Sequence, residues 1–212
     1  MLTFQAHQAR NLVIQFSDTT IEDERLKLDS NEHLYYLGHH LTLRRCHLII
    51  KVPRRALVIF RTQLIDCTID VKKELKGFRW EGVILKGCQF SGAMTGNDFG
   101  RWPYAEQPEL GSIEDCDFTN ARLDACRFIN CDLSRVKLPS WPCFSILSPA
   151  GRKNELLAHQ WPGTMHITVD AFTEGPAETA AVTYFAPAVA KRNDTTPEAI
   201  RAVLDTLPGV IL

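Results

Sequence analysis

The stretch CDFTNARLDACRFINCDL, residues 116–133, carries a large apolar residue at every fifth position. These residues are Phe118, Leu123, Phe128 and Leu133. A small residue stands two positions before each of them: Cys116, Ala121, Cys126 and Cys131. A period of five fits neither an α-helix, which repeats every 3.6 residues, nor a strand, which repeats every two. It fits a chain that turns a corner every five residues, so that four corners close a square coil of about 20 residues.

A longer period of the expected coil length runs through the preceding part of the chain. Cys46, Cys67 and Cys88 are 21 residues apart, each with an aliphatic residue three positions before it and an apolar residue two positions after it. Cys116 repeats this frame after 28 residues, and Val136 takes the place of the cysteine 20 residues later. Because stacked coils place like residues over like, we expect a buried column of cysteines, which are small and easily buried. The predicted core is Cys46, Cys67, Cys88, Cys116, Phe118, Leu123, Phe128 and Leu133.

Residues 116–133 resemble the pentapeptide-repeat family, whose unit has a small residue, a polar residue, Leu or Phe, and two variable residues. The match is tight over 111–140, looser over 41–92, and absent over 141–212. The resemblance implies a right-handed quadrilateral β-helix, in which stacked coils pair backbone to backbone. It implies no particular activity, because members of the family have many different roles, which they perform mostly by binding.

The chain therefore divides into three parts. Residues 1–40 lack the clean period of five and are predicted to form irregular N-terminal coils or a cap. Residues 41–140 form the solenoid, interrupted by an inserted loop at 92–110, which is rich in glycine and proline. Residues 141–212 form a small α/β appendage that covers the C-terminal end, so the fold class is β-dominated with an α/β cap.

Within the appendage, the pattern of residues predicts two helices and two strands. We expect a short helix at 153–160 and strands at 165–172 and 180–185. Thr196-Pro197-Glu198 is typical of a helix start, with threonine as the N-cap and proline in the first turn.

Composition indicates a globular protein in a reducing compartment. The 212 residues are 45% hydrophobic and carry a formal net charge of -1, which does not favour nucleic acid or an anionic membrane. The first residues lack the apolar core of a secretory signal, and no apolar run is long enough to span a bilayer. Seven cysteines, an odd number without a C-x-x-C pair, are expected to be free thiols. We predict a cytoplasmic protein without membrane contact.

No motif for catalysis or metal binding stands out, so we expect no catalytic residue, no metal and no cofactor. The seven histidines make no recognisable ligand spacing, and Cys143 has no paired histidine. A P-loop, a dinucleotide fingerprint and a G-x-S-x-G setting are all absent. The acids Asp115, Asp117, Asp124 and Asp132 fall outside the inward positions and are predicted to form a solvated wall.

Two groups of residues are candidates for partner binding. Residues 43–76 hold nine bases and three acids, whereas residues 17–32 hold six acids and two bases. We favour neutralisation between neighbouring coils, with a basic face for an acidic partner as the alternative. Arg, Trp and Tyr in the inserted loop resemble a binding hot spot, although they could equally fold back over the solenoid. The candidates are Arg44, Arg45, Arg54, Arg55, Arg101, Trp102 and Tyr104.

Three classes of function follow. The first is a protein-binding inhibitor, most concretely an immunity protein that neutralises a toxin-like effector; this partner is favoured. The second is a DNA mimic that binds a type II topoisomerase such as gyrase, but residues 111–140 hold five acids and four bases, a weak field for that role. The third is a polysaccharide-acting enzyme, although β-helical enzymes of that kind use longer coils. Direct binding to nucleic acid is not expected, and a homodimer through a solenoid end is left open.

Overall fold

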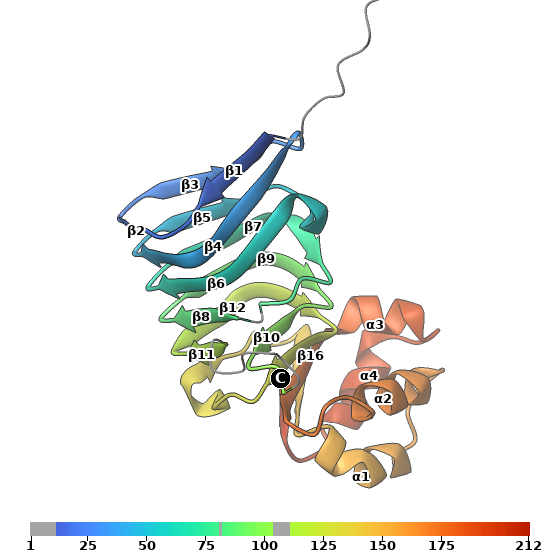
Figure 1. Cartoon of the computed structure of the whole chain (residues 1–212). Coiled ribbons are helices and arrows are strands. Elements are labelled where there is room, and N and C mark those ends of the chain that lie inside the picture. Colours follow the sequence, from blue (N-terminus) through green and yellow to red (C-terminus); the bar gives the residue numbers. More distant parts are fainter. Residues whose placement is uncertain (1–11, 81, 104–110) are drawn as a thin grey trace, which may run out of the picture.

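The computed structural model describes residues 12–80, 82–103 and 111–212. Its strands form a stack of parallel coils, and its four α-helices gather at the C-terminal end (Figure 1). The predicted parallel β-solenoid is therefore confirmed. No helix within the described ranges has the length and apolar character needed to cross a membrane.

The described residues form three sheets. The first has the order β1-β4-β6-β8-β11, with β2 also paired to β4, and the second has the order β14-β12-β9-β7-β5-β3. The first comprises β1 (Leu12–Phe16), β2 (Thr20–Glu22), β4 (His33–Arg44), β6 (Leu57–Ile65), β8 (Val83–Lys86) and β11 (Ser112–Glu114). The second comprises β3 (Arg25–Leu28), β5 (His47–Ile50), β7 (Thr68–Lys76), β9 (Gln89–Thr95), β12 (Cys116–Asp124) and β14 (Val136–Lys137). All pairs within these two sheets are parallel, as coils stacked in one direction require.

The register of the coils follows the repeat seen in the sequence. Leu48 pairs with Ile69, and Ile69 pairs with Phe90, so each residue lies over the one 21 positions later. Cys116 pairs with Val136, which takes the cysteine position in the last coil. Side chains of one kind therefore form columns through the core.

The predicted core residues line the inside of the coils. Seven of the eight are at most 1% exposed, and Leu133 is half-buried against the same cluster. Aromatic rings dominate the later coils: Phe90 stacks on Phe118 with ring centroids 4.4 Å apart, and Phe118 meets Phe128 edge to face at 5.2 Å. Such contacts add to the stability that comes from burying each ring.

Small inward residues at the corners carry hydrogen-bond donors. The Asn97 Nδ2 donates to the carbonyl of Thr95, two residues earlier, at 3.0 Å and to the carbonyl of Leu75, in the preceding coil, at 2.8 Å. Cys67 and Thr62 make the same two kinds of bond. A buried carbonyl without a partner is costly, so a small residue with a donor suits the corner better than alanine.

The residue before each of these donors has a left-handed backbone conformation. Asp66 precedes Cys67 with φ of 53°, and Gly87 precedes Cys88 with φ of 63°. A Cβ built on Gly87 would lie 2.2 Å from the Asp66 Oδ1. Glycine adopts this conformation without strain, and at position 87 it also leaves room for the Asp66 side chain of the preceding coil.

Gly87→Ala is expected to lower the free energy of unfolding by about 2 kcal/mol, because the new Cβ is strained at positive φ and crowds the coil below. Urea unfolding followed by circular dichroism measures the loss. Gly151→Ala is the matched control, since a Cβ there meets nothing within 4 Å, and its effect should stay within about 0.5 kcal/mol. Equal stabilities of the two variants would contradict the assigned corner.

The inserted loop is shorter than the sequence predicts. Strands β9 and β10 (Asp98–Gly100) occupy part of the range 92–110, so the chain leaves the coil only at Arg101. The glycines that suggested a loop serve close stacking instead: a Cβ on Gly92 would lie 2.0 Å from the Val71 carbonyl oxygen, and one on Gly100 would lie 2.2 Å from that of Ile129. Residues 104–110 lie outside the described part of the chain.

The N-terminal segment is also more regular than predicted. Although residues 12–28 lack the period of five, β1 and β2 pair in parallel with β4, and β3 pairs in parallel with β5. The described part of this segment is thus a first coil.

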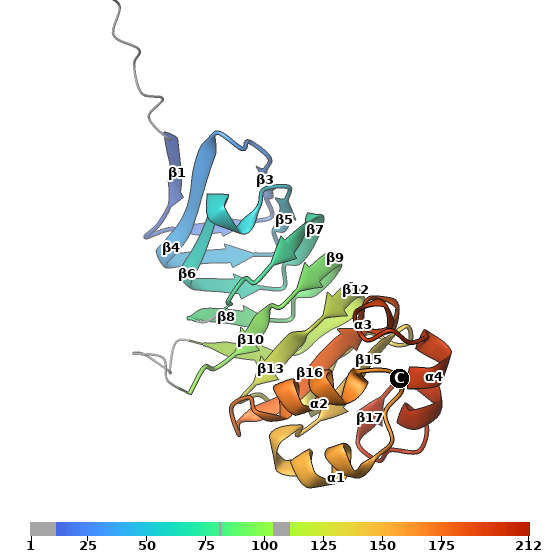
Figure 2. The same ribbon diagram turned by 90° about the vertical axis from the view of Figure 1, so that its right-hand side faces the viewer.

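The third sheet joins the solenoid to the C-terminal unit. Its order is β10-β13-β16-β15-β17, and β16 pairs antiparallel with both β13 and β15 (Figure 2). Its remaining strands are β13 (Cys126–Ile129), β15 (Cys143–Leu147), β16 (Thr179–Phe185) and β17 (Val210–Ile211). The helices beside it are α1 (Lys153–Ala158), α2 (Met165–Thr173), α3 (Ala186–Arg192) and α4 (Pro197–Leu204).

One prediction for this unit was wrong. Residues 165–172, expected to be a strand, belong to α2, where Met165, Val169 and Phe172 are buried at helical spacing. The helix start at Thr196 is as expected, with the Ala199 amide donating to the Thr196 Oγ1 at 3.2 Å.

A buried ion pair ties the two parts together. Asp124, predicted to be solvated, is only 6% exposed, and both of its oxygens accept hydrogen bonds from the Arg192 guanidinium, at 2.5 and 3.0 Å. The Phe185 amide donates to the same carboxylate at 3.3 Å. The period of five places Asp124 on the outside of a coil, but the C-terminal unit covers that outside.

Arg192→Met is expected to cost about 2 kcal/mol of stability, because it leaves the Asp124 carboxylate buried without its main partner. Because the Arg192 guanidinium is half-exposed, the loss of stability should be smaller than for a fully buried ion pair. Chemical unfolding is the measurement. Arg135→Met removes a partner from Asp115 in an exposed pair and should cost less than about 1 kcal/mol. Equal losses in the two variants would contradict the role of the buried pair.

Candidate protein-interaction surface

Two of the predicted binding arginines are engaged within the solenoid. The Arg45 Nε lies 2.7 Å from the Asp23 Oδ1, and its Nη2 lies 2.8 Å from the Glu22 Oε2. The Arg44 Nε lies 3.8 Å from the Glu22 Oε1. Acids of the first coil thus neutralise these bases of the next, which is the interpretation that the sequence favoured for the charge imbalance.

Arg54 and Arg55 are placed differently. Both lie on the 3-10 helix Arg54–Ala56 at a corner of the solenoid, and both are exposed. Within the described ranges, neither has an ion-pair partner. Their charge therefore remains available to another molecule.

Trp102 leaves the solenoid at the start of the inserted loop and lies back against it. The guanidinium carbon of Arg79 lies 5.3 Å from the centre of the indole, and that of Arg127 lies 5.0 Å from it. Arg127 is itself held by two hydrogen bonds to Asp98, at 2.7 and 2.9 Å. Trp102 is half-buried, so these cation–π contacts keep part of its ring at the surface in a fixed orientation.

Arg101 and Tyr104 complete the predicted loop site. Arg101 is exposed and borders a small hollow of about 200 Å³ beside Glu114, Asp132 and Arg135. Tyr104 lies outside the described residues.

A hollow of about 420 Å³ lies between the arginines at the solenoid corner and the start of the inserted loop. It is lined by Arg54 on one side, Val58 and Phe60 on β6, and Phe78 and Arg79 on the next coil. Phe60 is 38% exposed although it is a large apolar residue. Arg79 both lines this hollow and stacks on Trp102, and exposed Arg55 follows Arg54 on the same 3-10 helix. We term this area the arginine–aromatic surface: Arg54, Arg55, Val58, Phe60, Arg79 and Trp102.

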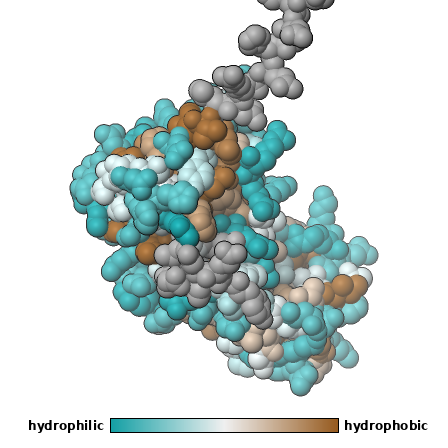
Figure 3. All heavy atoms as spheres, viewed as in Figure 1, coloured by the Kyte–Doolittle hydropathy of each residue, from teal (hydrophilic) through white to brown (hydrophobic). Residues whose placement is uncertain are grey.

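The surroundings of this area are apolar as well. Figure 3 shows hydrophobic side chains gathered on the face that β1, β4 and β6 form. Val13 on β1 is 50% exposed, and Tyr36 on β4 pairs in register with Val58. The sequence does not mark Phe60 and Val58 as surface residues, because an apolar residue in a strand-rich segment gives no sign of which face it occupies.

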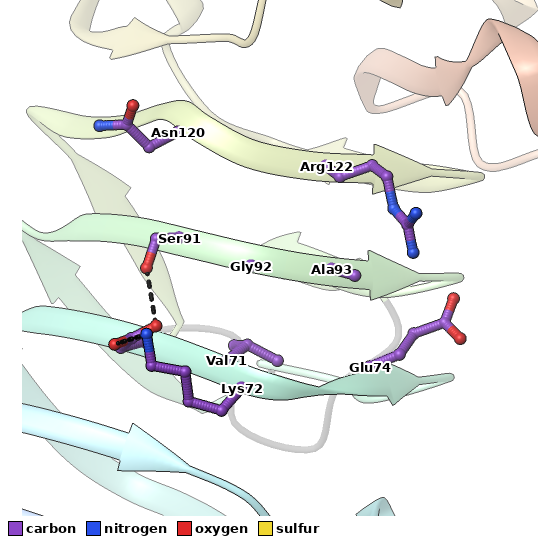
Figure 4. A pocket seen from close by; sticks show the side chains of 9 residues that line it. Val71, Lys72, Glu74, Ser91, Gly92, Ala93, Asn120 and Arg122 are labelled. Atoms are coloured by element: carbon purple, nitrogen blue, oxygen red, sulfur yellow. Dashed lines mark hydrogen bonds and ion pairs between the residues drawn. The ribbon is translucent and has the colours of Figure 1, made fainter.

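A second hollow, of about 520 Å³, lies on the outer face of β7, β9 and β12 (Figure 4). Its floor is made by the small residues at 91–93, and its rims carry Lys72 and Glu74 on one side and Arg122 on the other. Most of these charged groups already have partners: the Lys72 Nζ lies 2.6 Å from the Asp70 carboxylate, the Lys76 Nζ lies 3.1 Å from the Glu74 Oε2, and the Arg122 guanidinium lies over the ring of Phe185. This polar trough offers a partner fewer unsatisfied groups than the arginine–aromatic surface.

The described residues hold no group of three or more His, Cys, Asp or Glu side chains that could bind a metal ion. Burial raises the pKa of the Cys143 thiol and raises that of Cys126 to about 12, which keeps both protonated and unreactive. All seven cysteines are free thiols, and six of them are buried. The arginine–aromatic surface offers charge, stacking and apolar contact to another molecule.

Comparison with known proteins bears on the repeat alone. A family model described as pentapeptide repeats (8 copies) matches residues 113–139. No curated protein and no solved structure gave a significant match. The matched residues include β12 and β13, where the period of five is most regular.

Proposed function

Because the chain is a pentapeptide-repeat protein, we propose that it is a non-enzymatic inhibitor that neutralises a toxin-like protein by binding it directly. Solenoids of this family are generally non-enzymatic scaffolds for protein interaction. The observation that carries the proposal is the arginine–aromatic surface, where exposed Arg54 lines the same hollow as the exposed ring of Phe60 and exposed Arg55 is its neighbour in the chain. Arginine and aromatic residues dominate the binding energy of protein interfaces.

The rigidity of the coils supports this role. Val58 and Phe60 lie on β6, which is held in the sheet by pairing with β4 at these residues and with β8 further along, and two guanidinium groups contact the ring of Trp102. A preorganised surface loses little conformational entropy when a partner binds. The partner is expected to present acidic groups, which the exposed Arg54 and Arg55 would attract and orient.

The charges of the later coils weigh against a DNA mimic. In residues 111–140 two of the five acids pair with bases of the next coil: the Arg135 Nη2 lies 2.5 Å from the Asp115 Oδ2, and the Lys137 Nζ lies 3.4 Å from the Asp117 Oδ2. A third, Asp124, pairs with Arg192. Such pairs leave a weak field, whereas a mimic of DNA needs rows of uncompensated negative charge. We further propose that the protein acts in the cytoplasm, where reducing conditions maintain free thiols.

The test is affinity capture of the tagged full chain from its native lysate, with mass spectrometry of the bound proteins. The account predicts a stoichiometric toxin-like protein, whose activity falls when the purified chain is added. Capture of gyrase or topoisomerase subunits would replace the proposal with the DNA-mimic function. A captured protein whose activity the chain leaves unchanged would contradict inhibition.

A further inference from the structure

The N-terminal end of the solenoid presents strand edges without partners. β1 and β2 pair with β4, and β3 pairs with β5; within the described ranges no strand covers their outer edges. At the opposite end the third sheet continues beyond the coils, because β16 pairs antiparallel with β13 and the C-terminal helices pack beside it (Figure 2). An unpaired edge is a template on which another strand can pair.

The core is also incompletely covered at this end. Phe16, Ile21 and Leu26 are only half-buried, although they point toward the same core as the residues paired with them in the next coil. Those partners, Leu37, Leu43 and Leu48, are each 0% exposed. A further layer over the first coil would bury the remaining apolar area and gain the corresponding hydrophobic stabilisation.

β1 lacks the features that normally protect an edge strand. Its sequence, LVIQF, contains no charged residue and no proline, and Val13 is 50% exposed. Soluble proteins usually protect such edges with charges, prolines or bulges. This edge is therefore suited to an interface.

We propose that two copies of this chain join through their N-terminal ends, with the two β1 strands side by side and antiparallel about a twofold axis. A second copy presents a coil of the same outline, as the neighbouring coils do within the solenoid. The same end also carries both acids and bases, among them Glu24, Arg25 and Lys27. A twofold arrangement can set the acids of one copy against the bases of the other. Head-to-tail stacking is disfavoured, because the C-terminal unit occupies part of the other end.

The pairing predicts which side chains meet. With Ile14 on the axis, Val13 of one copy lies opposite Gln15 of the partner subunit. Both side chains are exposed in the single chain, so substitutions there leave the core intact. Like charges directly opposite each other destabilise a pair of strands, and opposite charges stabilise it.

Sedimentation velocity of the full chain over a concentration series tests the proposal. The wild type should sediment with an apparent mass twice that of the monomer. V13K/Q15K should raise the dissociation constant of the dimer at least about tenfold. V13E/Q15K, which sets a carboxylate of each copy against an ammonium group of the other, should restore the dimer. T119K/N120K adds the same charges to exposed positions of β12 and should not change it.

A wild type that remains monomeric at every concentration would overturn the proposal. A dimer unaffected by V13K/Q15K would do the same, because the contact would then lie elsewhere. Failure of V13E/Q15K to restore dimers would overturn the antiparallel pairing of β1. If the chain forms a complex only with a different co-purifying protein, that protein and not a second copy covers this edge, and the proposal is overturned. Circular dichroism of each variant confirms that the coils remain folded.

Discussion

Phe118→Asp should abolish cooperative folding. Phe118 is 0% exposed and contacts Phe90, Phe99 and Phe128, with ring centroids between 4.4 and 5.2 Å from its own. The substitution removes these contacts and buries a carboxylate without a partner. The expected loss is at least about 5 kcal/mol, which is comparable to the whole stability of a typical domain. Thermal unfolding followed by circular dichroism measures it.

Asn120→Asp is the matched control for this prediction. It introduces the same carboxylate on the same strand, but at an exposed position. Its stability should stay within about 0.5 kcal/mol of the wild type. If the Phe118→Asp protein were soluble and unfolded as cooperatively as the control, the inward direction of the period of five would be wrong.

Replacing the arginine–aromatic surface should abolish partner binding without affecting the fold. In R54E/R55E/F60S, two attractive charges become repulsive toward an acidic partner and the exposed ring is lost. Each central residue of such an interface contributes about 2 kcal/mol or more, so binding should weaken at least about a hundredfold. Calorimetric titration with the captured partner gives the dissociation constant, and thermal unfolding should remain near that of the wild type.

K73E/K191E provides the control with an equal change in net charge. Lys73 and Lys191 are exposed on other faces of the molecule. If binding depends on the local surface, this variant should bind within about threefold of the wild type. An equal loss of affinity in both variants would show that only the total charge matters, which would contradict the assigned surface.

Much of the solenoid could be predicted from the spacing of residues alone. The frame around Cys46, Cys67 and Cys88 indicated the coil length because coils that stack must repeat their inward residues. The same logic failed for Gly92 and Gly100. Glycines in a sequence suggest a loop, but here the lack of a Cβ allows neighbouring coils to approach closely. It also failed for 165–172, where a short apolar pattern fits a strand or a helix and the packing of the C-terminal unit decides.

The candidate surface was only partly predictable. Positive charge in residues 43–76 was evident, but the sequence could not separate Arg45, which pairs with Asp23, from Arg54, which has no partner among the described residues. That distinction depends on which coil lies beneath each side chain. Phe60 was missed because its outward direction follows from the strand register, and Asp124 was misplaced because a distant segment covers it.

Hydrogen exchange of the full chain, free and bound to the captured partner, tests the central claim most directly. The account predicts slowed exchange in peptides covering Arg54–Phe60 and Phe78–Arg79, with little change over the polar trough or α1–α4. Protection confined to the trough or the C-terminal helices would contradict the assigned surface. A partner that binds with no protection anywhere on the solenoid would contradict the view that the coils form the binding platform.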